Sequence, residues 1–326
     1  MAYDYSKAPS RGITTMKLLL ITVIICTYRR LDRLILSLNS LEHQTYNGFD
    51  WEVLVVENDI ASTSAMNAVI ENYKHKLPIR HILEPQVGLS KARNTGAHLA
   101  NGEYLAYLDD DAEVAEDWLV TLTEACRSYI PDFCGGPSLP LYLSPKPDWY
   151  LDKYATSYVY GDVIQFLKTG EWLGGMNFIV LKKLCSELGC FRTDLGMNGD
   201  KVAYGEETDL MIRAWKYNPQ LKVLYHPKIA VRHEVRPEKM TLYWNIKAAL
   251  AGGRSFSLLS SISRKEAVFE LLRNVKKMTL LVSDAVKMRY HKQEEPLLWQ
   301  QWIYEVFCPW LWNVSRNYHA FIQSQK

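Results

Sequence analysis

The chain has 326 residues, enough for one large core or for a main domain with an appendage. Its 38 basic and 36 acidic residues give a net charge of +2, and this near balance gives no reason to expect a nucleic-acid partner. The six cysteines form no CxxC pair and no zinc-like spacing, and no signal peptide precedes them, so a reduced, cytoplasmic protein is expected.

The amino-terminal residues 1–16 are polar and predict a frayed tail. An apolar run from Met16 to Tyr28 follows, interrupted by Thr22. This run is much shorter than the roughly 20 residues that a membrane-spanning helix needs. A strand at residues 18–26 is therefore expected.

Apolar strand-like runs then alternate with segments of helical spacing. Strands are expected at 18–26, 51–58, 79–85 and 103–111, and helices at about 30–44, 62–76 and 88–101. This alternation predicts parallel βαβ units with right-handed crossovers. In such a sheet ligands bind beyond the carboxyl ends of the strands. The residues that follow three of these strands, at 26–28, 57–59 and 109–111, should therefore converge on one edge.

The second half of the chain is less regular. From Trp118 to about residue 170, five prolines favour loops. A strand and a helix are then expected within 172–189, a helix opened by acids at 205–219, and a strand-like segment at 222–235. After Pro237 the composition changes to helical segments separated by the sequence AGGRS, residues 251–255, and by basic stretches.

Three consecutive carboxylates, Asp109, Asp110 and Asp111, close the strand expected at 103–111. Carboxylate oxygens are preferred ligands of Mg²⁺ and Mn²⁺, ions that commonly keep part of their coordination shell for phosphates. Of two acids separated by one residue at a strand end, one can bind metal and the other can hydrogen-bond a ribose hydroxyl. Taken alone, the triplet is more readily explained as a solvated acidic turn, so its interpretation depends on the rest of the chain.

Motifs in the same order and at the same spacing occur in family 2 glycosyltransferases, which this chain resembles over roughly residues 18–240. They are residues 23–46, 51–59, 87–119 and 205–235. The resemblance implies an α/β GT-A fold, with a mostly parallel nucleotide-binding sheet flanked by helices and, in this chain, a C-terminal helical extension. It also implies a nucleotide-diphosphate sugar donor, a divalent metal (Mn²⁺ or Mg²⁺) and inversion at the anomeric carbon.

The resemblance implies roles for individual residues. Asp111 corresponds to the metal ligand of the family's DxD motif, Asp109 to the acid that faces the ribose, and Asp110 to the residue between them. Glu57 stands where the family usually has aspartate, and Arg93 resembles the arginine that approaches the nucleotide. The other positions that the resemblance assigns to the donor are Thr27, Tyr28, Asp59 and Gly88, with Asn94 in the same motif as Arg93.

A second acidic cluster, Glu206, Glu207 and Asp209, opens the helix expected at 205–219. In an inverting transfer one carboxylate must remove the proton of the acceptor hydroxyl. Glu207 aligns with the family's usual base, while Glu206 and Asp209 remain alternatives. Acids at a helix start also interact favourably with the helix dipole without any catalytic role.

Two further motifs follow from the resemblance. His233 matches a late histidine that supplies another metal ligand in some members, although a lone histidine after a strand is more often structural. The segment beneath the donor sugar and the acceptor corresponds to Trp172, Gly174, Gly175, Met176 and Asn177. Its glycines would let backbone approach a ligand closely, and a tight turn before a buried strand is the alternative explanation.

We expect a tail at 1–16, a GT-A domain at 17–237 and a C-terminal helical region at 238–326. A UDP-sugar is the first choice of donor. The acceptor would be a hydroxyl, in a glycan or a lipid-linked glycan if the chain serves polysaccharide or lipid-linked glycan assembly. Two other functions stay open: a nucleotidyltransferase acting on sugar phosphates, disfavoured because no glycine-rich phosphate loop follows the first strand, and a non-catalytic nucleotide-sugar-binding module.

The C-terminal region contains bulky aromatic residues, including Trp299, Trp302, Trp310 and Trp312, and a basic helical stretch at 263–293. This composition suits peripheral contact with a membrane surface, at the inner face of the membrane for a cytoplasmic protein. Packing on the catalytic domain, or self-association with a partner subunit, is the favoured interpretation, since tryptophan is also a core residue.

Overall fold

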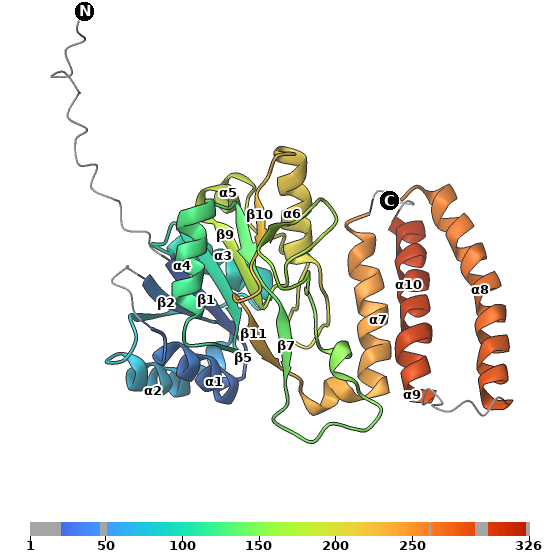
Figure 1. Cartoon of the computed structure of the whole chain (residues 1–326), viewed down its shortest axis with the longest axis horizontal. Coiled ribbons are helices and arrows are strands. Elements are labelled where there is room, and N and C mark those ends of the chain that lie inside the picture. Colours follow the sequence, from blue (N-terminus) through green and yellow to red (C-terminus); the bar gives the residue numbers. More distant parts are fainter. Residues whose placement is uncertain (1–20, 46–50, 261, 291–298, 324–326) are drawn as a thin grey trace, which may run out of the picture.

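The computed structural model describes residues 21–45, 51–260, 262–290 and 299–323. The expected tail at 1–16 lies outside these residues, as do residues 18–20 of the first expected strand. Figure 1 shows a mixed α/β body followed by a row of three long helices at one side of the molecule.

The central sheet has eight strands in the order β3-β2-β1-β4-β9-β6-β10-β8. Its first four strands are parallel, as the alternating pattern predicts: β3 (Ile79–Leu83), β2 (Trp51–Glu57), β1 (Ile21–Thr27) and β4 (Tyr104–Asp109). The other half is mixed, because β9 (Asn177–Leu181) runs antiparallel to both β4 and β6 (Phe133–Gly135). β10 (Val223–Tyr225) is parallel to β6, and β8 (Gln165–Phe166) forms the antiparallel edge.

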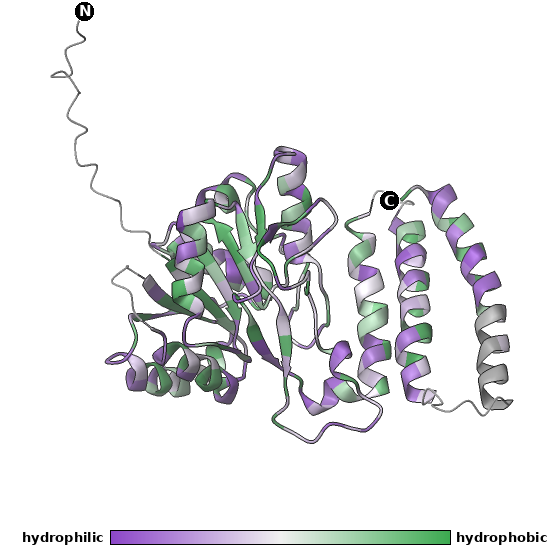
Figure 2. Cartoon of the chain, viewed as in Figure 1, coloured by the Kyte–Doolittle hydropathy of each residue, from purple (hydrophilic) through white to green (hydrophobic). Residues whose placement is uncertain are grey.

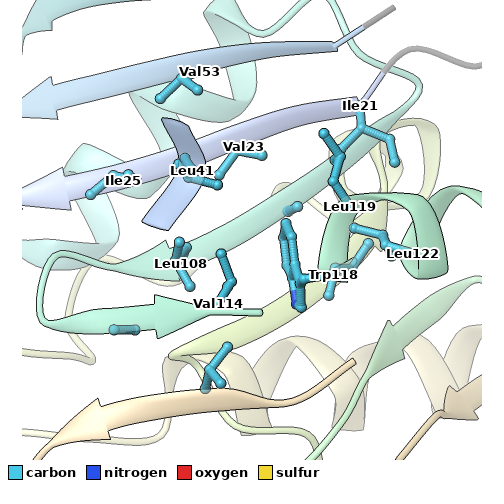
Figure 3. Close-up of a cluster of buried hydrophobic side chains, with 14 of the residues drawn as sticks. Ile21, Val23, Ile25, Leu41, Val53, Leu108, Val114, Trp118, Leu119 and Leu122 are labelled. Atoms are coloured by element: carbon cyan, nitrogen blue, oxygen red, sulfur yellow. The ribbon is translucent and has the colours of Figure 1, made fainter. Parts of the chain in front are cut away.

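Both faces of β1, β2 and β4 are buried, which explains their largely apolar runs, whereas the edge strand β3 is only partly buried. On one face Val23 and Ile25 pack with side chains of α1 (Leu31–Glu42), α2 (Thr63–Tyr73) and α4 (Trp118–Tyr129) (Figure 3). On the other face Ile24 packs with α3 (Leu89–Leu99) and α6 (Glu206–Tyr217). α3 lies so close to the sheet that a Cβ at Gly96 would come within 2.7 Å of Ile24 Cγ2.

One regular helix was not predicted. The segment from Trp118 to about residue 170 begins with the 12-residue α4, whose Trp118 is fully buried in the core. The prolines that favour loops all lie after this helix, where the chain is irregular apart from short strands and the 3₁₀ turn Asp152–Tyr154. Another short 3₁₀ turn, Ile60–Ser62, precedes α2, and the six-residue α5 (Lys182–Glu187) follows β9.

A small second sheet, also not predicted, positions the late histidine. It has the order β5 (Ala112–Val114), β11 (Val231–Glu234) and β7 (Ser138–Leu141). β11 runs antiparallel to β5, in a register that pairs His233 with Ala112. His233 is thereby brought beside the acids that precede Ala112.

After the 3₁₀ turn Pro237–Met240, the chain forms α7 (Leu242–Ser257), α8 (Arg264–Tyr290), α9 (Trp299–Trp302), a π-helical turn (Ile303–Phe307) and α10 (Cys308–Gln323). α10 lies between α7 and α8, and α8 is the outermost helix (Figure 1). Within the described residues, no helix combines the length and apolarity that crossing a membrane would require.

The interpretation of AGGRS as a break between helices is wrong, because residues 251–255 lie inside α7. The two glycines let α7 approach α10 closely. A Cβ at Gly252 would lie 2.8 Å from Trp312 Nε1, and one at Gly253 would overlap the Trp312 carbonyl oxygen. Close packing between helices, rather than a turn, accounts for these glycines.

Candidate active site

A cavity of about 700 Å³ opens at the carboxyl edge of the parallel strands. Its walls come from the residues after β1 and β4, the starts of α3 and α6, β11, and the helical region after residue 237. A volume of this size is typical of sites for small organic ligands. The strand-end rule therefore located the cavity correctly.

The sheet register brings the strand ends together. Cys26 pairs with Asp109 on one side and with Val56 on the other, so Thr27 and Asp109 lie on adjacent strands at the edge of the cavity. Asp109 is about one third exposed, whereas Asp110 and Asp111 are almost completely buried. The acidic triplet is therefore not a solvated turn.

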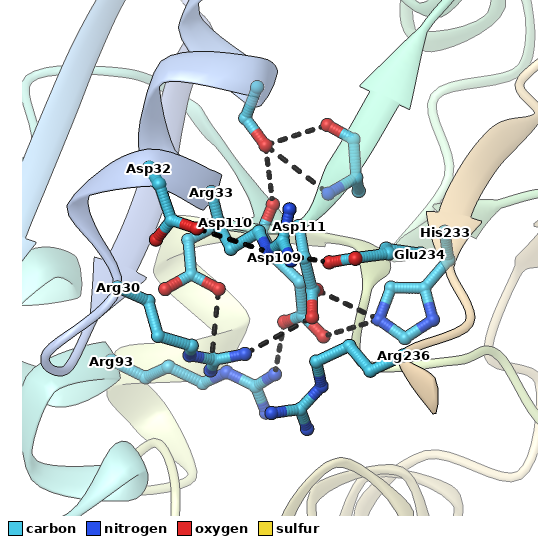
Figure 4. Close-up of polar contacts among 12 residues, drawn as sticks. Arg30, Asp32, Arg33, Arg93, Asp109, Asp110, Asp111, His233, Glu234 and Arg236 are labelled. Atoms are coloured by element: carbon cyan, nitrogen blue, oxygen red, sulfur yellow. Dashed lines mark hydrogen bonds and ion pairs between the residues drawn. The ribbon is translucent and has the colours of Figure 1, made fainter. Parts of the chain in front are cut away.

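Asp109, Asp111 and His233 form a cluster of three groups able to bind a metal (Figure 4). Their ligand atoms lie within 4.8 Å of one another, with Asp111 Oδ1 2.9 Å and Asp109 Oδ2 3.6 Å from His233 Nε2. Two carboxylates and an imidazole suit Mn²⁺ or Mg²⁺ with coordination positions left for phosphate oxygens. These three side chains therefore fit the Mn²⁺ or Mg²⁺ that the family resemblance implies.

Asp111 is held in its ionised form, as a metal ligand must be. Burial by itself would raise the pKa of this carboxyl. The hydrogen bond and charge of His233, with the positive charges of Lys239 and Arg30, outweigh burial and lower the pKa well below its ordinary range.

Arg30 lies against the buried acids. Its Nη1 is 3.1 Å from Asp111 Oδ2, and its Nη2 is 3.3 Å from Asp110 Oδ1. Burial raises the pKa of Asp110 to about 7, against the attraction of Arg30. Arg30 was not among the predicted site residues, although it directly follows β1 and the strand-end rule could have included it.

At the start of α6, Glu206 and Arg93 form a buried ion pair. Arg93 Nη1 donates to Glu206 Oε1 at 2.8 Å, and both side chains are about 95% buried. Arg93 Nη2 also donates to the Gly175 carbonyl oxygen at 3.1 Å and lies 3.5 Å from Asp109 Oδ1. A Cβ at Gly175 would lie only 2.9 Å from the guanidinium, so this contact requires glycine. Arg93 thus ties the two acidic clusters together.

The three acids of the second cluster have different surroundings. Glu206 is engaged by Arg93, and Asp209 pairs with Arg213 at 2.7 Å and Arg192 at 3.3 Å without lining the cavity. Glu207 lines the cavity and, in the described part of the chain, forms no ion pair. Burial, reinforced by the negative charge of Glu206, raises the pKa of Glu207 to about 8. Of the three, Glu207 has the geometry of a proton acceptor.

Most of the predicted site residues line the cavity. They are Thr27, Tyr28, Arg93, Asp109, Asp110, Asp111, Gly175, Met176, Glu206, Glu207 and His233. The predicted residues that do not line it are Glu57, Asp59, Gly88, Trp172, Gly174, Asn177 and Asp209.

Several of the residues outside the cavity wall have structural contacts. Glu57 lies 3.0 Å from His81 Nε2, and Asp59 pairs with Arg29. Trp172 packs edge-to-face on Trp215. Gly88 N donates a hydrogen bond to Asn58 Oδ1. Asn177 Nδ2 donates one to the Ile229 carbonyl oxygen. Asn94, from the same motif as Arg93, exchanges hydrogen bonds with the Phe191 backbone.

Sequence reasoning missed one wall of the cavity. Besides Arg30, it includes Arg236 and Lys239 after β11, and Trp244 and Lys247 on α7. Arg236 and Lys239 closely follow the motif that contains His233, which was a usable signal for both. Trp244 and Lys247 lie beyond the boundary expected at 237, so the C-terminal helices contribute to the cavity.

Comparison with known proteins shows which family and which relatives this chain is similar to. The model of glycosyl transferase family 2 matches residues 22–168, which include the acidic triplet. This match and the relatives below support a family 2 glycosyltransferase. Two relatives extend the similarity beyond the matched segment: the glucosyl-dolichyl phosphate glucuronosyltransferase of Haloferax volcanii, 23% identical over 69% of this chain and 72% of its own length, and the succinoglycan biosynthesis protein ExoM of Rhizobium meliloti, 28% identical over 73% and 74%.

Solved structures of glycosyltransferases share the fold. TarS 1–349 of S. aureus in complex with UDP-GlcNAc is similar over 78% of this chain and 70% of that chain, with a TM-score of 0.52 and 18% identity. Mannosyltransferase PcManGT of Pyrobaculum calidifontis, in complex with GDP-Man and Mn²⁺, is similar over 90% of this chain and 72% of that chain, with a TM-score of 0.52 and 17% identity. The α/β fold of this chain is the expected GT-A fold, and the family match favours sugar transfer over nucleotidyl transfer.

Proposed function

We propose that this chain moves a glycosyl group from a nucleotide-diphosphate sugar to an acceptor hydroxyl with inversion at the anomeric carbon. One observation carries the proposal: the metal-ligand cluster of Asp109, Asp111 and His233 lines the same cavity as the carboxylate of Glu207. A UDP-sugar is the first choice of donor, and UDP-GlcNAc is the ligand of one structural neighbour while GDP-Man is that of another.

The donor's diphosphate would bind at the metal-ligand cluster. A bound Mn²⁺ or Mg²⁺ supplies charge stabilisation to the departing diphosphate. Arg30, Arg236 and Lys239 line the same part of the cavity and supply further positive charge. Thr27 and Tyr28, at the end of β1, are proposed to border the nucleobase, and Asp109 the ribose.

Glu207 is proposed as the general base. Its carboxylate takes the proton of the acceptor hydroxyl, the acceptor oxygen bonds to the anomeric carbon, and the bond from that carbon to the diphosphate breaks. The ion pair of Glu206 with Arg93 positions Glu207 at the first turn of α6 and fixes the Gly175 backbone opposite it.

The acceptor is proposed to enter beside Gly175 and Met176, and Trp244 also lines the cavity. The indole of Trp244 offers a flat apolar face of the kind on which sugar rings pack. Relatives are named for a glucosyl-dolichyl phosphate and for succinoglycan biosynthesis. A glycan or lipid-linked glycan acceptor, in polysaccharide or lipid-linked glycan assembly, is therefore the setting that we propose.

A panel of UDP- and GDP-sugars, incubated with the purified chain in Mn²⁺ or in EDTA, tests the function. We expect one donor to release nucleoside diphosphate slowly without acceptor, and only with metal. Release of pyrophosphate from a nucleoside triphosphate and a sugar phosphate would instead identify a nucleotidyltransferase. Metal-dependent binding of a donor without turnover, even with glycan acceptors present, would identify a binding module.

A further inference from the structure

The outermost helix, α8, exposes a group of apolar side chains to solvent. Phe269, Leu272 and Val275 are each 65–66% exposed, and Val268 is 39% exposed. At 3.6 residues per turn these four positions fall within about 120° of the helix circumference. The opposite side of α8 is buried through Ala267 and Asn274. The exposed residues therefore form a continuous stripe, called here the α8 outer face.

Basic side chains accompany the stripe. Between residues 264 and 279, α8 carries Arg264, Lys265, Arg273, Lys276 and Lys277 against Glu266 and Glu270. Lys265 and Lys276 fall within the angular span of the apolar residues, and both are exposed. Figure 2 shows the corresponding mixture of hydrophobic and hydrophilic positions on the upper turns of α8.

The tryptophans that suggested membrane contact in the sequence have different surroundings. Trp312 packs against Gly252, Gly253 and Phe256 of α7. Trp310 donates its indole N–H to the Asn274 carbonyl oxygen of α8 at 2.9 Å. Trp302 stacks with Phe307, and only Trp299 is mostly exposed. The tryptophans at 310 and 312 thus hold the helices together, whereas the apolar side chains of the α8 outer face remain exposed.

We propose that the α8 outer face binds a membrane surface containing anionic lipid. A helix with bulky apolar side chains flanked by lysines and arginines lies in the lipid interface with its apolar residues inserted and its cations at the headgroups. α8 is suitably placed, because it lies on the far side of α10 from α7 and the cavity (Figure 1). The inference does not depend on the sugar donor or on catalysis.

The positive charge of the α8 outer face favours a membrane over a second copy of the chain as its binding partner. A symmetric dimer through this face would bring the basic side chains of one α8 against those of the other, and like charges in contact are unfavourable. An anionic lipid surface presents the complementary charge and attracts Lys and Arg side chains near it.

Vesicle flotation of the full chain tests this proposal. We expect the protein to float with vesicles of phosphatidylcholine mixed with phosphatidylglycerol, and not with phosphatidylcholine alone. Raising the salt from about 0.15 M to about 1 M shortens the Debye length from about 8 Å to about 3 Å and should release most of the bound protein. The triple variant Phe269→Ser, Leu272→Ser, Val275→Ser should lose about tenfold or more in vesicle partitioning, because it removes the inserted area.

A matched control replaces three equally exposed apolar residues outside α8. Ile60, Ile130 and Val163 are 61–67% exposed, so Ile60→Ser, Ile130→Ser, Val163→Ser removes similar exposed area. This variant should float like the original chain, and circular dichroism establishes that both variants remain folded. Equal flotation of the α8 variant, or no flotation of the original chain, overturns the proposal. It is also overturned if light scattering shows a dimer of the original chain that the α8 variant converts to a monomer.

Discussion

The pKa of the Glu207 carboxyl depends on the residues around it. It is partly buried in the cavity wall next to Glu206, whose own charge is engaged by Arg93. Arg93 partly offsets the effects of burial and of Glu206, but the pKa of Glu207 still rises. A base with a pKa near the working pH combines a useful ionised fraction with a strong tendency to accept a proton.

Replacing Glu207 by glutamine should abolish most of the transfer without weakening donor binding. The amide has the shape of the carboxylate but cannot accept the acceptor's proton, and general-base catalysis contributes about 10²–10⁴-fold. We expect kcat to fall by about that factor, while the Kd of the nucleotide diphosphate in Mn²⁺ is unchanged. Initial rates at saturating donor, together with calorimetry, check both quantities.

The neighbouring acids provide the controls. Asp209→Asn breaks the ion pairs with Arg213 and Arg192 away from the cavity, so it should lower the Tm and leave kcat near normal. Glu206→Gln loosens Arg93 and should weaken donor binding. Near-normal transfer by Glu207→Gln, with a collapse of kcat in one of the other two variants, would assign the base to that neighbour.

The raised pKa of Glu207 predicts two opposite pH trends. The proposed base would act as a carboxylate, so kcat/KM should rise about tenfold per pH unit below about 8 and level off above it. Stability should move the other way. Because the folded-state pKa is above the ordinary value of 4.5, the folded chain binds more protons than the unfolded chain between 4.5 and about 8, and this group reduces stability as the pH rises through that range.

Thermal unfolding of the original chain and of Glu207→Gln isolates the stability effect. The glutamine variant should have the higher Tm at pH 8, by roughly 2–4 °C per kcal/mol, and the difference should vanish near pH 4.5. A Tm difference that is independent of pH would contradict the raised pKa.

At the scale of elements, the contact between α7 and α10 depends on the absence of side chains at Gly252 and Gly253. A glycine in a helix is about 0.5–1 kcal/mol less favourable than alanine, so an alanine with room to fit would stabilise α7. Here a Cβ at Gly253 would overlap the backbone carbonyl oxygen of Trp312, whereas one at Gly252 would meet the side chain of the same residue. A side chain yields more easily than backbone.

We therefore expect Gly253→Ala to destabilise the chain by about 1–3 kcal/mol, the usual effect of overpacking. Gly252→Ala should change stability less, because the indole of Trp312 can shift. Urea unfolding of both variants, compared through their midpoints at equal m-values, checks this order. Stabilisation by Gly253→Ala would show that α7 and α10 do not pack as closely as described.

The elements that sequence reasoning predicted are those with a regular local pattern. The runs now in β1, β2 and β4 are buried on both faces and the helices between them have apolar residues at helical spacing, so the parallel half of the sheet could be predicted. α4 was missed because the prolines that follow it dominated the interpretation of its segment. The second sheet was missed because its strands have three or four residues and exist only through long-range pairing, such as His233 with Ala112.

At the scale of the whole molecule, the cavity is shared between the α/β body and the helices that follow it. The acids at 109–111 and 206–207 could be placed at the site from strand ends and family motifs. Trp244 and Lys247 could not, because their place in the wall depends on how the C-terminal helices pack against the body. The similarity to PcManGT also extends into this region, since it covers 90% of the chain and residues 1–237 make up less than three quarters of it.

The most direct test of the central claim is calorimetric titration of UDP and GDP into the chain in Mn²⁺ and in EDTA, with the variants Asp111→Asn and Glu71→Gln. Asp111 belongs to the metal-ligand cluster, whereas Glu71 is an acid on α2, paired with Lys74 and absent from the cavity wall. We predict that one nucleotide binds in Mn²⁺ and not in EDTA. Asp111→Asn should weaken this binding by at least about tenfold, ~1.4 kcal/mol. Glu71→Gln should leave it unchanged. Equal binding in Mn²⁺ and EDTA, or an undiminished affinity of Asp111→Asn, would contradict the account.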